Sequence, residues 1–277
     1  MSSLVVDTNL SALNALNVLN QTDAAQSQAI SELSSGLKIQ TAATGPAQYA
    51  ISQSLEAQSN GYNQAISNAQ NGVSLIQTAG GALAQISSIL QQMDQLALTS
   101  ATSVTQTTSS RTANQAEFKD LANTITEIAS TTSFGKAHLL NGTFSGTLQV
   151  GAFDSTATQI GLSIAGMKLT TLALSTATVG IGNAASAQAA VSAVQTALSK
   201  VDTAAAKVGA TQNELNAIVA NLTVGQQNLA AANSQLVDVN MAQEMTAFTT
   251  DQILMQSGVA MLGQAQQTPS LVLKLLS

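Results

Sequence analysis

The side chains that could carry out acid–base, nucleophilic or metal chemistry are few and scattered in this chain. It has one histidine, His138, and no cysteine, so a histidine cluster, a thiolate nucleophile and a cysteine-based metal site are all excluded. The glutamates stand singly, without a neighbouring base or nucleophile, at Glu32, Glu56, Glu117, Glu127, Glu214 and Glu244. We therefore predict that the chain is not an enzyme, with no catalytic residue, no metal site and no cofactor.

The charge content excludes a further class of function. The net charge is −6, and the eight basic residues are scattered singly rather than clustered. A nucleic-acid groove needs clustered Lys or Arg to neutralise phosphates, so we expect no nucleic-acid partner. Charged residues make up 8% of the chain, about a third of the usual share, so Ser, Thr, Asn and Gln must dominate the surface.

The apolar residues favour helix packing over a ligand pocket. They form 45% of the chain while aromatics form only 3%, which indicates a core of Ala, Leu, Ile and Val. Residues 57–93 carry no charge, but Asn, Gln, Ser and Gly interrupt them every few positions. We expect no membrane span from such a stretch. The start of the chain lacks a basic region followed by an apolar run, so we expect no cleaved signal peptide.

Both ends of the chain carry apolar residues at helical spacing, with very few charges among them. We interpret these arms as stripes that pack against each other and against other copies of the chain, which predicts a polymer subunit. Asn and Gln within the arms have two interpretations, a solvated helix face or neutral subunit contacts. The residues of the stripes are Leu10, Leu13, Leu16, Leu19, Ile30, Leu33, Leu37, Met255, Val259, Leu262, Leu273 and Leu276.

Long helices must position these arms. The first is predicted from Leu10 to Leu37 with Gly36 as its terminator, and Pro46 marks a restart. From Tyr62 to Ala97 apolar residues step by four and three, except for two successive steps of three that predict an insertion near Gly80. The glycine pair at 80 and 81 is either a weak point of the helix or a place where a neighbouring backbone comes close.

The rest of the chain predicts a further helix, a β region and a rod. A Ser/Thr-rich interruption over residues 99–112 precedes a helix with Phe118 and Ile125 on one face. Period-two alternation and frequent glycines predict a small β region at about 134–182. Apolar spacing from Val191 to Leu236 predicts a helix of about 50 residues.

The fold class is therefore mainly α: an elongated antiparallel helical bundle or coiled coil with a small β-hairpin region in the middle of the sequence. We expect residues 1–40 and 240–277 to form terminal helical arms. Residues 41–239 would form a helical rod that includes the β region.

Several blocks of the chain resemble bacterial flagellins in order and spacing. Residues 33–39 (LSSGLKI) are similar to the family's LSSG(L)(R/K)I signature, and residues 68–83 (NAQNGVSLIQTAGGAL) resemble its NAxDGxSxxQxxEGAL stretch. Residues 134–142 and 148–151 are similar to its FNGxxLLxG turn and QVG strand. Residues 265–276 (AQQTPSLVLKLL) resemble its ANQxPxxVLxLL terminus, so the likeness covers essentially the whole chain.

The resemblance implies a structural subunit of the bacterial flagellar filament, of a minimal type without the variable outer domains. It places the arms in the inner core of a self-assembling helical homopolymer for swimming. It implies a flagellar export chaperone, cap and junction proteins as partners, and extracellular localisation through the flagellar type III route. The alternatives are a hook–filament junction (hook-associated) protein and a flagellin-like surface adhesin.

One surface departs from the family pattern. Members that activate the flagellin-sensing Toll-like receptor present an Arg, a Leu and a Glu on neighbouring helices. The resemblance maps these onto Gln92, Leu96 and Glu117, so the leucine and the glutamate are kept while glutamine replaces the arginine. Glutamine lacks the planar, permanently charged donor fork of arginine, so we expect receptor activation to be impaired.

Overall fold

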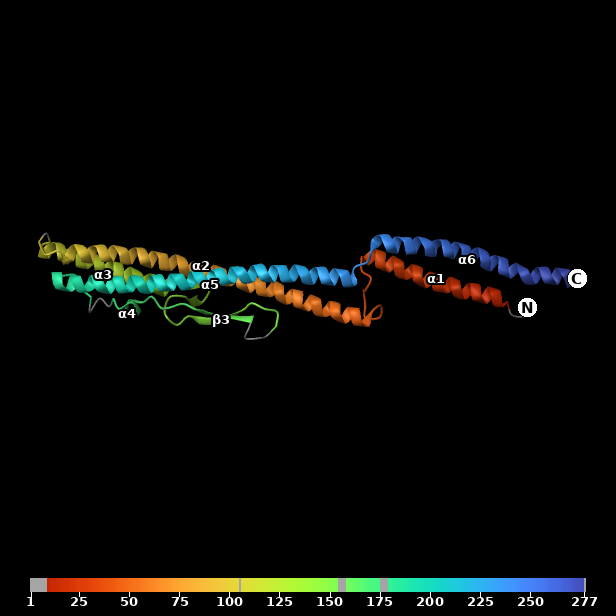
Figure 1. Cartoon of the computed structure of the whole chain (residues 1–277), viewed down its shortest axis with the longest axis horizontal. Helices are drawn as coiled ribbons and strands as arrows, with labels where there is room; N and C mark the ends of the chain where they lie inside the picture. Colours follow the sequence, from red (N-terminus) through yellow and green to blue (C-terminus); the bar gives the residue numbers. More distant parts are fainter. Residues whose placement is uncertain (1–8, 105, 154–157, 175–178, 277) are drawn as a thin grey trace. The chain divides into compact units, whose positions relative to one another are not determined.

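The computed structural model describes residues 9–104, 106–153, 158–174 and 179–276, and the side chains of the last helix as far as Gln267. The described part is mainly helical, as expected, with two small antiparallel sheets (Figure 1). Contacts divide the chain into two compact units, residues 1–57 with 228–277 and residues 58–227. The elements are α1 (Leu10–Ser35), α2 (Pro46–Ala101), α3 (Thr108–Thr131), β1 (Ser133–Phe134), β2 (Ala137–His138), β3 (Ser145–Gln149), β4 (Gln159–Ser163), α4 (Leu169–Leu172), α5 (Ala184–Val237) and α6 (Met241–Leu276).

The main part of the first unit is an antiparallel pair of helices, α1 and α6 (Figure 1), and the unit also includes the start of α2 and the end of α5. At the start of α1, the Asn9 side chain accepts a hydrogen bond from the Ala12 N–H and donates one to the Ala265 carbonyl of α6. At its end, Gly36 adopts the left-handed conformation with φ 74°. The predicted helix end at Gly36 and the restart at Pro46 are both confirmed.

Backbone hydrogen bonds tie the two arms together where α1 ends and α6 begins. Leu37 and Asp238 form an antiparallel β-bridge. The Lys38 N–H donates to the Val237 carbonyl at 2.7 Å, and the Val239 N–H donates to the Gly36 carbonyl at 3.0 Å. We call this connection the arm clasp. The predicted domain borders at residues 40 and 240 lie within the first unit, and the division into arms and rod stays a prediction.

The second unit is built on α2, α3 and α5, whose buried rows share one core. On α2 the row runs in alternating steps of four and three without a break, so the insertion predicted near Gly80 was wrong. The sequence pattern had followed Tyr62, Ile66, Val73 and Gly80, which lie on the flank of this row and are only half-buried. The buried row of α2 is Ala65, Ala69, Gly72, Ile76, Ala79, Leu83, Ile86, Leu90, Met93 and Ala97.

The other two long helices supply matching rows. On α3 the buried residues are Phe118, Ala122, Ile125 and Ala129. They include Phe118 and Ile125, which were predicted to share one face of this helix. On α5 the buried row starts with Ala187 and continues through Ala190, Val194, Ala197, Val201, Ala204 and Val208. The predicted long helix is confirmed at 54 residues. The many alanines in all three rows let the helices approach closely, which explains why so few aromatics are needed.

The glycines that permit close packing are not the pair that the sequence suggested. A Cβ added at Gly80 would meet only Val208 at an ordinary 3.6 Å, and one at Gly81 would meet nothing within 4 Å. A Cβ at Gly61 would lie 2.5 Å from the Ala152 Cβ and 2.9 Å from its Cα. Gly61 is therefore the glycine of α2 against which another segment's backbone comes close.

The β elements are shorter than predicted. The hairpin pairs β3 with β4, from Ser145 opposite Ser163 to Gln149 opposite Gln159. Among the residues that the structure describes, the last strand ends at Ser163 rather than near residue 182, and the short helix α4 follows. The reason lies at Gly166, where a Cβ would come within 2.6 Å of the Gly142 Cα, so the chain leaves the sheet to cross another backbone.

Two further details of α2 differ from expectation. The Ser/Thr-rich interruption is narrower than residues 99–112, because α2 continues to Ala101 and α3 starts at Thr108. An 18-residue window of α2 has a mean hydropathy of 1.3, so by length and composition alone this helix could cross a membrane. From the polar residues in this stretch we had expected no membrane span. In this structure Ile76, Leu83 and Leu90 use that apolarity to fill the core.

Candidate assembly surfaces

The two arms contact each other through one narrow seam. Its positions on both helices repeat in steps of three and four, the spacing of an antiparallel coiled coil. Several of the residues are small, and Gly258 lies so close to α1 that an added Cβ would be 3.2 Å from the Leu19 Cδ1. The seam consists of Ala12, Ala15, Leu19, Thr22, Gln26, Ala29 and Leu33 on α1 and Glu244, Phe248, Asp251, Met255, Gly258 and Leu262 on α6, all buried or half-buried.

Most of the predicted apolar stripe of α1 lies off this seam. Leu10, Leu13 and Leu16 are 68%, 56% and 42% exposed. A residue turns by about 100° in an α-helix, so each step of three moves the next leucine about 60° around the axis. The run of leucines therefore winds away from α6, and Leu19 alone of the four reaches the seam. Further along, Ile30 and Leu37 are exposed while Leu33 lies on the seam.

The predicted stripe of α6 divides in the same way. Met255 and Leu262 face α1, whereas Val259 is 56% exposed. Ile253, Leu254 and Met261 are exposed as well. Leu273 and Leu276 belong to α6, but their side chains lie outside the described residues. Each arm therefore carries two apolar surfaces: a seam row used within the chain and an outward row that the described residues of this copy leave uncovered.

Two buried polar residues of α1, one on the seam and one beside it, were missed by the sequence reasoning. Thr22 and Glu32 are buried on α1, and Glu32 accepts a 2.8 Å hydrogen bond from the Gln28 side chain one turn earlier. The Thr22 hydroxyl donates to the Val18 carbonyl. Their signal was the heptad spacing, which a search for hydrophobic residues alone does not register.

The residues mapped onto the receptor-facing patch lie on two helices of the second unit. Gln92 and Leu96 stand one turn apart on α2, exposed and half-buried, and Glu117 is exposed on α3. His138 lies exposed on β2. Within the part of the chain that the structure describes, no group of His, Asp or Glu residues is arranged to hold a metal ion.

Comparison with known proteins identifies the family. The model of the bacterial flagellin N-terminal helical region matches residues 6–145, and that of the bacterial flagellin C-terminal helical region matches residues 191–276. A flagellin of Halalkalibacterium halodurans is 38% identical over 274 residues, covering 99% of this chain and 100% of that protein. The flagellar filament 33 kDa core protein of Treponema phagedenis is 34% identical over 288 residues, with 99% and 100% covered.

A solved structure supports the fold alone. A putative flagellar hook-associated protein from Vibrio parahaemolyticus has a TM-score of 0.59 and 14% identity, covering 70% of this chain and 100% of that one. Only residues 146–190 separate the two matched family regions, which leaves no room for a large inserted domain. This chain therefore belongs to the bacterial flagellins, as a short member without the variable outer domain, and flagellins are the structural subunits of the flagellar filament.

Proposed function

We propose that the outward rows of α1 and α6 are the contacts through which this flagellin builds its filament. The observation that carries the proposal is the exposure of three leucines of α1, Leu10, Leu13 and Leu16, which lie off the seam. A helix pair that needed only to hold itself together would not need further leucines outside the seam. Here Leu10, Leu13 and Leu16 point outward, where other copies can cover them.

The energetics favour covering these rows by assembly. Burying a leucine fully contributes about 1.5–3 kcal/mol relative to leaving it exposed. Ordering a residue opposes this by about 1–2 kcal/mol of backbone entropy, so a pair of arms held by one narrow seam is only marginally stable. We infer that the arms are disordered in the free monomer and fold as they enter the filament, where both apolar rows become buried.

A pair of substitutions tests the outward row directly. Leu13→Asn with Leu16→Asn keeps the seam intact and removes two of the outward leucines. We expect purified protein to lose the ability to form sedimentable filaments, while the second unit keeps its thermal unfolding midpoint. Val104→Asn is the control, because Val104 is 91% exposed on the second unit and lies outside the arms. Normal filaments from the double variant would contradict the proposal.

Proteolysis of the soluble monomer tests the coupling of folding to assembly. We expect protease to remove about the first and last 30 residues rapidly and to spare residues 58–227. The same sites should resist cleavage in the filament. Arms that resist cleavage equally in both states would show that they fold before assembly.

The outward rows also suggest what must happen before assembly. We propose that a flagellar export chaperone covers them inside the cell, that the chain leaves by the type III route without cleavage, and that cap and junction proteins meet the same rows at the filament ends. Mass spectrometry of protein from flagella should then find the N-terminal residues intact. Electron microscopy of the purified chain should show long filaments, and short oligomers alone would contradict the filament assignment.

A further inference from the structure

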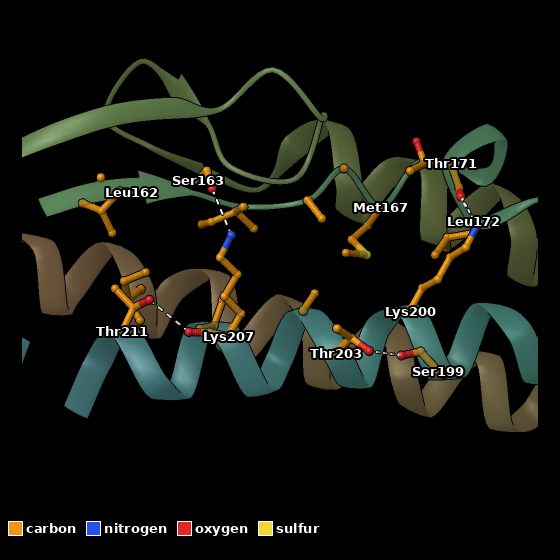
Figure 2. A pocket seen from close by; sticks show the side chains of 17 residues that line it. Leu162, Ser163, Met167, Thr171, Leu172, Ser199, Lys200, Thr203, Lys207 and Thr211 are labelled. Atoms are coloured by element: carbon orange, nitrogen blue, oxygen red, sulfur yellow. Dashed lines mark hydrogen bonds between the residues drawn. The ribbon is translucent and has the colours of Figure 1, made fainter. Parts of the chain in front are cut away.

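A groove lies within the second unit. It has a volume of about 380 Å³ and lies between α5 on one side and the segment from Gly161 to Leu172 on the other (Figure 2). Its apolar lining comes from side chains that are themselves buried, including Leu162, Met167 and Leu172. The groove is thus a built feature of the fold, in which exposed polar side chains surround a buried apolar floor.

Two lysines of α5 stand at the edge of this groove. The Lys200 ammonium donates to the Thr171 carbonyl at 2.7 Å, and the Lys207 ammonium donates to the Ser163 hydroxyl at 3.2 Å (Figure 2). Both acceptors are neutral, and no described carboxylate is hydrogen-bonded to either ammonium. The lysines are seven residues apart, so they share one helix face at a separation of about 10.5 Å along the axis. The groove therefore presents two positive charges at a fixed spacing.

The same spacing occurs with opposite sign on α3. Asp120 and Glu127 are also seven residues apart, and both are exposed. Among the described residues, neither carboxylate accepts a hydrogen bond. The exposed residues between them, Asn123, Thr124 and Thr126, have short and uncharged side chains, so this face of α3 can come close to another surface. We call Asp120 to Glu127 the acidic row.

We propose that the groove between α5 and the Gly161–Leu172 segment receives the acidic row of α3 from a second copy of this chain, with Asp120 and Glu127 pairing with Lys200 and Lys207. The proposal rests on the filament function and adds a contact between second units to the contacts between arms. Two matched pairs fix the register of one helix against the groove, whereas one pair would not.

The strength of such a contact suits a polymer. An exposed ion pair alone contributes little, and two pairs would not hold two free monomers together. In a filament the arms already keep neighbouring copies at a high effective concentration, so a weak second contact adds to the first instead of acting alone. The pairing therefore specifies register between copies rather than supplying the bulk of the affinity.

Charge reversal on both sides tests the pairing. We expect Lys200→Glu with Lys207→Glu to raise the critical concentration for filament growth about tenfold, since attraction becomes repulsion at two positions. Asp120→Lys with Glu127→Lys should have the same effect. The quadruple variant, with both sides reversed, should return to within about twofold of the parent.

The controls separate this pairing from net charge, folding and the filament function itself. Lys136→Glu with Gln91→Glu and Gln95→Glu changes net charge equally at exposed residues outside the groove. These changes should leave filament growth unchanged on their own, and they should not restore growth when combined with the acidic-row reversal. Circular dichroism of each variant should show parental helix content. The pairing would be overturned if the variant with both lysines reversed grew filaments as well as the parent does. It would also be overturned if the quadruple variant grew no better than either double variant. Neither result would affect the filament function. Failure of the parent chain to polymerise would instead refute the filament function.

Discussion

Replacing one glycine at a time in α2 separates helix propensity from packing against the loop after β3. Gly61 and Gly81 lie in the same helix and in the same compact unit. An alanine at either position should stabilise the helix by about 1 kcal/mol, because glycine loses more backbone entropy on folding. The two positions differ only in what the new methyl group meets.

At Gly81 the methyl group has open space, and at Gly61 it collides with Ala152. Overpacking of this kind costs about 1–3 kcal/mol, and the middle of that range leaves Gly61→Ala about 1 kcal/mol less stable than the parent. For a unit of this size, 1 kcal/mol corresponds to a change of about 2–4 °C in Tm. We therefore expect Gly81→Ala to raise Tm by about 2–4 °C and Gly61→Ala to lower it by a similar amount.

Thermal unfolding followed by far-UV circular dichroism measures both changes. Adding Ala152→Gly to Gly61→Ala removes the nearest atom of the collision, so the double variant should recover part of the loss. If Gly61→Ala raises Tm as much as Gly81→Ala does, the loop does not pack against α2 at Gly61 and the reasoning is refuted.

Three further predictions concern the core, the clasp and the receptor patch. Phe118→Ala should lower the free energy of unfolding by about 3–5 kcal/mol in a denaturant titration, since Phe118 is fully buried; a loss below about 1 kcal/mol would contradict its central place in the core. Gly36→Ala should raise the critical concentration for assembly without changing the Tm of the second unit, because a residue with φ 74° strains any side chain by about 1–2 kcal/mol, and unchanged assembly would refute this. Gln92→Arg should raise activation of the flagellin-sensing Toll-like receptor in a reporter assay from a weak parental response, and a strong parental response would count against the prediction.

The long helices could be predicted from the sequence because their signals are strong and local. Gly36 and Pro46 marked real boundaries. Apolar spacing located the end of α5 to within one residue, while its start at Ala184 lies seven residues before the predicted Val191. Membership of a structural protein family confirms the prediction that the chain is not an enzyme, which rested on its lone histidine and isolated glutamates.

The faces of the helices were harder to predict than their limits. In α1 the seam consists of Ala12, Ala15 and Thr22 as much as of Leu19, and small or polar residues carry little hydropathy. The predicted stripe followed the large leucines instead, although most of them face outward. On α2 the pattern ran along the flank of the buried row, because Ala79 is less conspicuous than the glycine pair that follows it. Close backbone crossings, such as Gly142 against Gly166, could not be predicted, because the two residues are far apart in the sequence and no local pattern connects them.

The arm clasp sets the order in which the chain can fold. The clasp joins Leu37 to Asp238, and closing a flexible loop of about 200 residues would be opposed by about 5 kcal/mol of chain entropy. The second unit removes most of that loop when it folds, because the Gln226 side chain donates to Asn63 at 2.8 Å and so brings both ends of the unit together. Only short segments then remain to be joined. We therefore expect the middle of the chain to fold first and the two arms to be joined last.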